Sequence, residues 1–170
     1  VYREYGVRDG ETAVIEPDGQ SHPMATELAG FDIVVNCILQ DPNRPMLFVQ
    51  GDEINQFQRG SLIVDVSCDE GMGFDFARPT SFGEPIFTVG DGITYYAVDH
   101  SPSYLWRSAT YEISSALLPY IEPVMSGSVA WQQNETIRRA IEIENGVIRN
   151  DDILRCQNRA ADYPHEKKDE

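Results

Sequence analysis

Two nearly continuous runs of apolar, largely β-branched residues constrain the fold of this chain more than any other feature. Residues 32–39 read DIVVNCIL and residues 61–68 read SLIVDVSC. Such runs are typical of strands that helices bury on both faces. A short helix is predicted between them over residues 52–57, before the turn at Arg59-Gly60. Because strand–helix–strand order favours crossover connections, we predict an α/β fold with a parallel sheet.

Weaker patterns predict the remaining elements. Residues 8–20 are polar and contain turn signals, which indicates a loop or a short hairpin, and residues 22–31 have room for one or two helical turns. Short strands are predicted at residues 87–89 and 93–98. Apolar residues at helical spacing predict a helix over residues 103–118, which Pro119 and Pro123 are expected to end. A second helix is predicted over residues 129–144, with Asn145-Gly146 as its C-cap.

Composition narrows the class of protein. The 170 residues are 41% apolar and 24% charged, as in ordinary globular domains. A formal charge of −15 argues against a phosphate-binding surface, so we expect no nucleic-acid partner. With no apolar run long enough for a membrane span and no signal-peptide pattern, we expect no membrane association and a cytoplasmic location. The three cysteines form no Cys-x-x-Cys pair, and we expect reduced thiols.

The segment over residues 90–105 concentrates chemically useful groups. Residues 93–98 predict a strand, Asp99-His100 follows it, and Ser101-Pro102 has the pattern of an N-cap and first helical residue. Open α/β sheets bind ligands at the carboxyl ends of their strands. The alternative is structural: Asp99 accepts from backbone donors at the helix entry, and His100 packs against Tyr104 or Trp106.

Other charged residues offer weaker signals. Asp65, Asp69 and Glu70 are dense enough in carboxylate to suggest Mg²⁺ or Ca²⁺, but the ligand spacing of an EF-hand is absent. We therefore expect a solvated loop and no metal site. Arg78 and Arg107 are candidates for holding a carboxylate substrate through two hydrogen bonds each, although Arg107 has a simpler role in pairing with a nearby carboxylate or with solvent.

Three runs together resemble a known family. Residues 32–39, 62–67 (LIVDVS) and 96–103 (YAVDHSPS), in this order, resemble the nucleotide-binding domain of the alanine dehydrogenase and transhydrogenase superfamily. Within it they look most like the N(5)-(carboxyethyl)ornithine synthases and, more distantly, the fungal-type saccharopine dehydrogenases. The similarity covers about residues 2–121. It implies a partial Rossmann-type domain, doubly wound around a parallel sheet, with C-terminal helices.

The resemblance also implies an activity and a set of site residues. The activity is an NADPH-dependent reductive condensation of pyruvate, a keto acid, with the side-chain amine of the amino acid ornithine or lysine. Asp99 and His100 would be the catalytic residues, beside the nicotinamide. The implied cofactor-binding residues follow three strands: Asn36, Cys37 and Ile38 after the first; Asp65, Val66 and Ser67 after the second; Val98 and Asp99 after the third.

Arg3 bears on the choice of nucleotide. In related folds an acidic residue at the end of the second strand binds the ribose of NAD, whereas a basic residue suits the 2′-phosphate of NADP. Here the corresponding strand end reads Val1-Tyr2-Arg3, and the first acidic residue is Glu4. We therefore expect Arg3 to contact NADP, with NAD as the alternative.

Two departures from the family pattern point to a missing part. No Gly-x-Gly-x-x-Gly turn occurs, and the only lysines are Lys167 and Lys168. We expect a complementing N-terminal catalytic and nucleotide-binding segment or chain, in a homo- or hetero-oligomer. Residues 1–121 would be the C-terminal part of the NAD(P)-binding domain. Residues 122–161 would form a helical segment packing back on the missing catalytic domain, and residues 162–170 a disordered tail.

Two alternatives remain open at this stage. One is an enzyme of the same class, similar to alanine dehydrogenase or saccharopine dehydrogenase, which differs in its amine and keto acid. The other is a non-catalytic interaction module derived from such an enzyme. The absent glycine turn and the lack of lysine before residue 167 favour the module.

Overall fold

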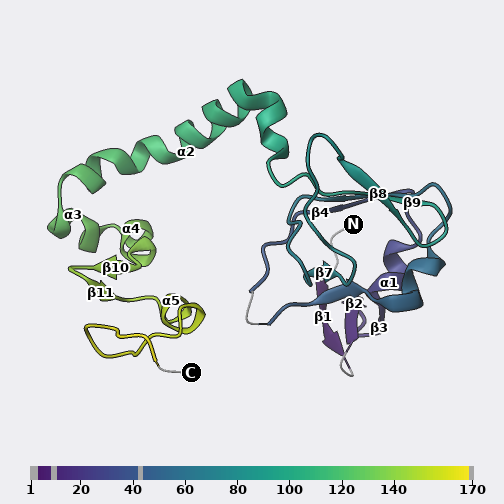
Figure 1. Ribbon diagram of the computed structural model, residues 1–170, viewed down its shortest axis with the longest axis horizontal. Coiled ribbons are helices and arrows are strands. Elements are labelled where there is room, and N and C mark those ends of the chain that lie inside the picture. Colours follow the sequence, from purple (N-terminus) through teal and green to yellow (C-terminus); the bar gives the residue numbers. More distant parts are fainter. Residues whose placement is uncertain (1–3, 9–10, 42–43, 169–170) are drawn as a thin grey trace. The chain divides into compact units, whose positions relative to one another are not determined.

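The structure is a computed structural model that describes residues 4–8, 11–41 and 44–168. It forms two compact units, residues 1–104 and residues 105–170, which are described separately below (Figure 1). The predicted nucleotide contact Arg3 lies outside the described residues. The predicted division into a nucleotide-binding part (residues 1–121), a helical segment that packs on a missing domain (residues 122–161) and a tail (residues 162–170) stays a prediction.

A four-stranded sheet organises the first unit. Its order is β4 (Ile33–Asn36), β6 (Leu62–Asp65), β9 (Ile93–Tyr96) and β8 (Ile86–Val89). β4, β6 and β9 are parallel, with Val64 paired to both Val35 and Tyr96, and β8 is antiparallel to β9. The two apolar runs are therefore neighbouring parallel strands, and the predicted α/β fold is confirmed.

Smaller elements surround this sheet. β1 (Glu4–Arg8), β2 (Glu11–Ile15) and β3 (Ser21–Pro23) form an antiparallel sheet, and α1 (Met24–Leu28) follows. β5 (Leu47–Val49) and β7 (Gly73–Phe74) make a second parallel pair. The helix predicted over residues 52–57 is the 3₁₀ helix η1 (Gly51–Gln56). Of the two structures predicted for residues 8–20, a loop or a short hairpin, the hairpin is confirmed, since β2 pairs antiparallel with its neighbours β1 and β3.

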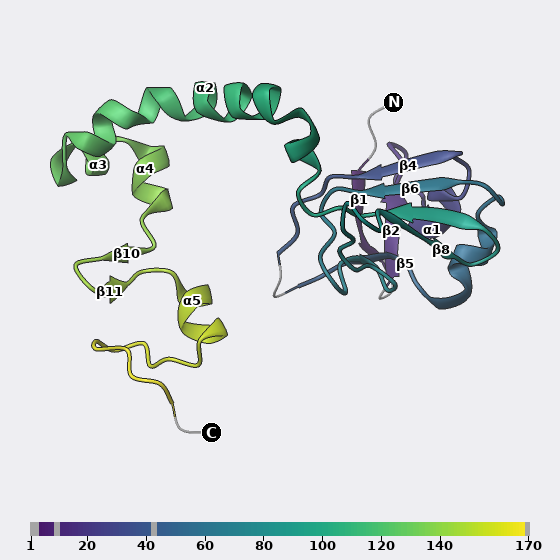
Figure 2. The ribbon, with the colours of Figure 1, turned by 45° about the horizontal axis from the view of Figure 1, so that its top comes forward.

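The main sheet is buried on one face only. On the buried face, the side chains of Ile63 on β6 and of Ile93 and Tyr95 on β9 are fully buried in a core that includes Phe48 and Phe74. Figure 2 shows the strands of this sheet on one side of α1. On the opposite face Ile33 is 60% exposed and Val35 58%. The prediction that helices bury these strands on both faces is therefore wrong for this chain, because no described element of the unit covers the second face.

A long helix opens the second unit. α2 (Trp106–Met125) follows the 3₁₀ helix η2 (Ser101–Leu105). The prediction that Pro119 and Pro123 end this helix is wrong, since it continues through both. Its residues are exposed or half-exposed, so water can hydrate the carbonyl groups that the prolines leave without an N–H partner. Among the described residues, no helix combines the length and hydropathy needed to cross a bilayer.

The helix predicted over residues 129–144 is also wrong. Two short helices, α3 (Ser128–Gln133) and α4 (Glu135–Ala140), replace it, and the Asn134 side chain caps α4 by accepting from the Ile137 N–H at 3.1 Å. Asn145 and Gly146 have φ of 52° and 81°, which suits a tight hairpin turn better than a C-cap. They join β10 (Ile143–Glu144) to β11 (Val147–Ile148), and α5 (Asp151–Cys156) follows.

His165 organises the described residues beyond α5. Its side chain is 2% exposed. Its Nε2 lies 3.0 Å from the Ile148 N–H, which donates to it, and its Nδ1 lies 3.0 Å from the Ala160 carbonyl oxygen. Arg159 forms an antiparallel bridge with Lys167. Residues 159–168 are thus hydrogen-bonded to one another and to β11.

Candidate functional site

The carboxyl ends of the three parallel strands meet at one edge of the sheet. Asn36 at the end of β4 pairs in register with Asp65 at the end of β6, and the Val66 N–H donates to the Asn36 carbonyl at 2.8 Å. Past β9, the Cys68 Sγ lies 3.8 Å from Asp99 Oδ1. The structure therefore brings together the site residues predicted after all three strands, apart from Arg3.

Asp65 holds this edge together from inside. Its side chain is 1% exposed and accepts three hydrogen bonds: from Asn36 Nδ2 at 2.9 Å, from the Cys68 N–H at 2.9 Å and from the Tyr95 hydroxyl at 2.6 Å. A Cβ on Gly73, whose φ is 78°, would lie 3.0 Å from Asn36 Nδ2. The Asp65 and Asn36 side chains thus bind each other inside this edge of the sheet.

Protonation states at this edge follow from burial. Burial raises the pKa of Tyr95, and the hydrogen bond to Asp65 raises that pKa further, so the hydroxyl remains a donor. Burial also raises the pKa of the Cys68 thiol to about 11, helped by the charges of Asp99 and Asp65. Because a thiol with such a pKa carries little thiolate at neutral pH, Cys68 is poorly suited to nucleophilic catalysis.

Several predicted residues present their side chains to solvent at the same edge. Cys37 and Val66 are exposed, and so are Asp99 and His100. Ser67 is half-buried because its Oγ donates to the Ile38 carbonyl at 2.8 Å. These exposed side chains are accessible to solvent at this edge, and their roles in binding or catalysis stay predictions.

A cavity of about 550 Å³ lies beside Asp99 and His100. A loop after β7 forms its wall and is fastened to the strand end: Thr80 N–H donates to the Ala97 carbonyl at 2.8 Å, and Thr80 bridges to Val98. Its lining residues are Arg78, Pro79, Thr80, Ser81, Glu84, Ile86, Phe87, Asp99 and His100.

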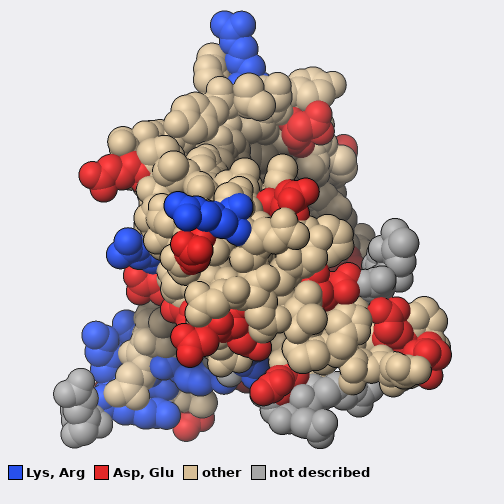
Figure 3. Space-filling model, turned by 90° about the vertical axis from the view of Figure 1, so that its right-hand side faces the viewer, with Lys and Arg blue, Asp and Glu red and all other residues tan. Residues whose placement is uncertain are grey.

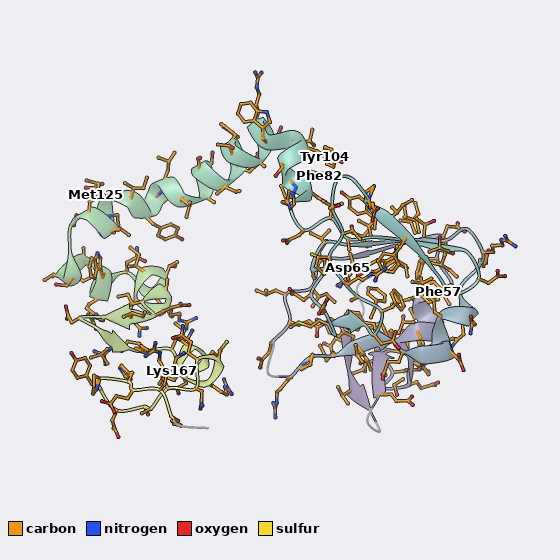
Figure 4. All side chains as sticks on the ribbon, viewed as in Figure 1. Phe57, Asp65, Phe82, Tyr104, Met125 and Lys167 are labelled. Atoms are coloured by element: carbon orange, nitrogen blue, oxygen red, sulfur yellow. The ribbon has the colours of Figure 1, made fainter. Side chains whose placement is uncertain are left out.

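His100 packs against an aromatic residue, but not against the two that the sequence suggested. Its ring lies edge-on to Phe82 with the ring centroids 4.7 Å apart, and Phe82 contacts Tyr104 at 4.2 Å (Figure 4). Asp99 accepts from the Cys68 thiol, whereas the structural alternative assigned it backbone donors.

Sequence reasoning missed three groups at this edge: the Tyr95 hydroxyl, Phe82 and Glu84. No spacing pattern marks a tyrosine in mid-strand as the partner of a carboxylate on the next strand, so Tyr95 carried no signal. The turn residues of the RPTSFGEP run, residues 78–85, were a usable signal, because a loop after a strand end often lines a site.

On the face drawn in Figure 3, acidic side chains lie dispersed among uncharged ones. Within the described ranges, no three His, Cys, Asp or Glu side chains gather closely enough to hold a metal ion.

Comparison with known proteins identifies similar chains. Alanine dehydrogenase from Halomonas elongata is 28% identical over 102 residues, which is 60% of this chain and 27% of that protein. Alanine dehydrogenase 1 from Staphylococcus aureus is 22% identical over 129 residues, which is 75% of this chain and 34% of that protein. A solved structure of L-alanine dehydrogenase has the same fold, with a TM-score of 0.64, 23% identity, and coverage of 78% of this chain and 37% of that one.

These relatives are much longer than this chain, which spans about a third of their length. The family model for the alanine dehydrogenase/PNT C-terminal domain matches residues 7–151, which include most of the chain and every predicted site residue except Arg3. The chain therefore belongs to the alanine dehydrogenase/PNT C-terminal domain family.

Proposed function

We propose that this chain supplies the nicotinamide side of a pyridine-nucleotide site in an oxidoreductase. The observation that carries the proposal is the convergence of three parallel strand ends, with Asp99 and His100 exposed beside a cavity. Membership of the alanine dehydrogenase/PNT family supports it. A bound pyridine nucleotide would supply a hydride to a carbon–nitrogen double bond.

The residues at this edge suit a flat, mostly apolar ring and its ribose. Val66 and Cys37 are exposed, while the larger polar side chains Asn36 and Asp65 are buried beneath them. Ile38 and Ser67, both half-buried, would border the same surface, whereas the Val98 side chain is 2% exposed and offers it no side-chain contact. Asp99 and His100 would orient the reacting groups and stabilise charge during reduction.

The substrates remain part of the proposal. The sequence runs favour a reductive condensation of pyruvate with the side-chain amine of ornithine or lysine. An activity like that of alanine dehydrogenase is the alternative, and the names of the relatives favour it. A saccharopine dehydrogenase-like activity is a further alternative. NADP is proposed from Arg3, with NAD as the alternative.

The site needs a complement. No glycine turn for the pyrophosphate occurs in this sequence, and its lysines lie at positions 167 and 168. We propose that a second segment or chain supplies both the pyrophosphate contacts and the acid–base groups, in a homo- or hetero-oligomer. The exposed apolar side chains of α2, such as Ile113 and Leu117 at 59% and 57%, support an assembled state.

An assay that measures the oxidation of NADPH or NADH tests this function. NADPH and NADH are each mixed with pyruvate and with ammonia, ornithine or lysine, using the chain as purified from its source together with any polypeptide that co-purifies with it. We expect oxidation of one nucleotide that requires both pyruvate and one amine. The Asp99→Asn variant should lower kcat by about tenfold or more. Equal rates in wild type and variant would contradict the assigned role.

One observation favours the non-catalytic alternative. The open face of the main sheet, with Ile33 and Val35 exposed, is a surface that a protein partner could cover. The two functions differ in one property: an interaction module would bind its partner normally and bind neither NADPH nor NADH.

A further inference from the structure

We infer that a buried cluster of hydrogen-bonded side chains holds the Asp99 carboxylate in one orientation at the candidate site. In this cluster Asp65, fixed by Asn36 and Tyr95, acts through Cys68, and Asp65 and Cys68 are the positioning residues. The inference rests on the proposed function and deepens it, because it gives Asp65 a role other than the direct cofactor contact predicted from the sequence.

Asp65 is fixed from both sides of β6. Its Oδ1 accepts from Asn36 Nδ2 on β4 at 2.9 Å, and its Oδ2 accepts from the Tyr95 hydroxyl on β9 at 2.6 Å. All three side chains are buried, and Figure 4 shows Asp65 inside the first unit. Since rotation of the carboxylate would leave buried donors without an acceptor, the neighbouring strands fix its orientation.

The fixed carboxylate in turn holds Cys68 in a backbone conformation that is rare for residues with a Cβ. The φ of Cys68 is 43°, in the left-handed region, and its N–H donates to Asp65 Oδ1 at 2.9 Å. Such conformations persist where the surrounding structure enforces them, and they cluster at functional sites. In this conformation the Cys68 Sγ lies 3.8 Å from Asp99 Oδ1.

The Asp99 side chain depends on this contact for a defined orientation. The backbone beside it is held, because Val98 bridges to Thr80 and the Ser101 N–H donates to the Val98 carbonyl at 3.1 Å. The carboxylate itself is at the surface, and within the described part of the chain its hydrogen-bond partner is the Cys68 thiol. Burial and the charge of Asp99 raise the pKa of this thiol to about 11, so it stays a donor at neutral pH.

A buried cluster can also serve stability alone, and Ser61 offers a control for that role. Ser61 directly precedes β6, at the opposite end of the strand from the candidate site. It is 3% exposed, and its Oγ has no hydrogen-bond partner among the described residues. Ser61→Ala and Cys68→Ala each remove one buried polar hydrogen beside the same strand, but only Cys68→Ala removes a contact with Asp99.

The first test measures the orientation of Asp99 by NMR of the full chain. Three-bond couplings report the χ1 rotamer of its side chain. We expect one rotamer in wild type, in Ser61→Ala and in Cys68→Ser, which keeps a hydrogen-bond donor. We expect averaging over rotamers in Cys68→Ala, and a well-dispersed spectrum verifies that each variant is folded.

Infrared spectroscopy tests the contact from the side of the thiol. The wild-type minus Cys68→Ala difference spectrum isolates the S–H stretch of Cys68. Because a hydrogen bond lowers this frequency, the band should move to a higher wavenumber when the same difference is taken in the Asp99→Ala background.

The effect on catalysis is measured by the oxidation of NADPH or NADH. Cys68→Ala should lower kcat by about tenfold or more, since a displaced reacting group loses alignment. Cys68→Ser should recover most of this loss, and Ser61→Ala should match wild type. A role in packing alone predicts no rescue by a donor.

The outcomes separate this inference from the proposed function. A single Asp99 rotamer in Cys68→Ala, or an S–H band that Asp99→Ala leaves unchanged, would overturn the inference. Equal losses of kcat in Cys68→Ala and Cys68→Ser would overturn it as well. If Asp99 responds to Cys68→Ala while wild type oxidises neither nucleotide, the positioning is supported and the proposed function is contradicted.

Discussion

Replacing Asp65 by Asn should weaken the main sheet without changing its shape. The carboxylate accepts hydrogen bonds from three donors on three different segments and is 1% exposed. Asn retains one oxygen for Asn36 and the Cys68 N–H, but it turns an NH₂ group toward the Tyr95 hydroxyl. That leaves one buried donor without an acceptor, at a cost of about 1–3 kcal/mol. Asp65→Ala removes all three acceptors and should cost about 3–5 kcal/mol.

Urea unfolding monitored by far-UV circular dichroism measures this change, and hydrogen exchange of peptides from β4, β6 and β9 locates it. Asp91→Asn, an identical replacement at an exposed turn, should change the free energy of unfolding by less than about 0.5 kcal/mol. Tyr95→Phe should cost about 1 kcal/mol. The double variant Asp65→Asn/Tyr95→Phe should lose less stability than the sum of the two single losses, because both changes remove the same hydrogen bond. Full additivity, or an Asp65→Asn effect as small as that of Asp91→Asn, would refute the network.

Three further predictions concern other parts of the chain. The Cys68 thiol should resist alkylation at pH 8 while the two exposed cysteines react, as peptide mass spectrometry can show. The pKa of Cys68 in the folded state is about 11 against an ordinary 9.0, so the thiol loses its proton first in the unfolded state. The free energy of unfolding should therefore fall between pH 9 and 11 by more in wild type than in Cys68→Ala. Pro119→Ala should restore a backbone hydrogen bond within α2 and slow amide exchange there, and exchange unchanged around residue 119 would contradict a continuous helix. His165→Ala should cost about 2–4 kcal/mol of local stability by removing both ring hydrogen bonds, seen as faster exchange at the Ile148 amide, and unaltered exchange at Ile148 would show that the contact is absent.

Much of the first unit was predictable because its signals are local. The apolar β-branched runs at residues 32–39 and 61–68 specify strands whatever surrounds them, and two adjacent strands separated by a crossover become parallel neighbours. The meeting of strand ends at one edge follows from this geometry. The open second face did not follow, because burial depends on tertiary packing that a local sequence pattern does not encode, and the described elements of the first unit leave Ile33 and Val35 exposed.

The failures in the second unit have identifiable physical causes. Proline ends helices when the freed carbonyl is buried, but along α2 water reaches it, so Pro119 and Pro123 are tolerated. Asn-Gly can end a helix or turn a hairpin, and at Asn145 the positive φ of both residues selects the hairpin.

For the site residues too, only part of the arrangement was predictable from the sequence. Placement of Asp99 and His100 at a strand end was readable from sequence, whereas the partner of each side chain was not. Asp65 was predicted as a ligand contact, yet its side chain is enclosed by Asn36 and Tyr95, which come from strands distant in sequence. Sequence spacing does not encode such contacts between strands, because they arise only when the register of the sheet is set.

The central claim is that this chain contributes half of a pyridine-nucleotide site and needs a complement. Native mass spectrometry of the protein purified from its source, with NADPH added at millimolar concentration, tests it in one measurement. The account predicts a species heavier than the 19.1 kDa chain that contains a second polypeptide or a second copy and carries bound nucleotide. A folded chain of 19.1 kDa that remains alone and binds no nucleotide would contradict it.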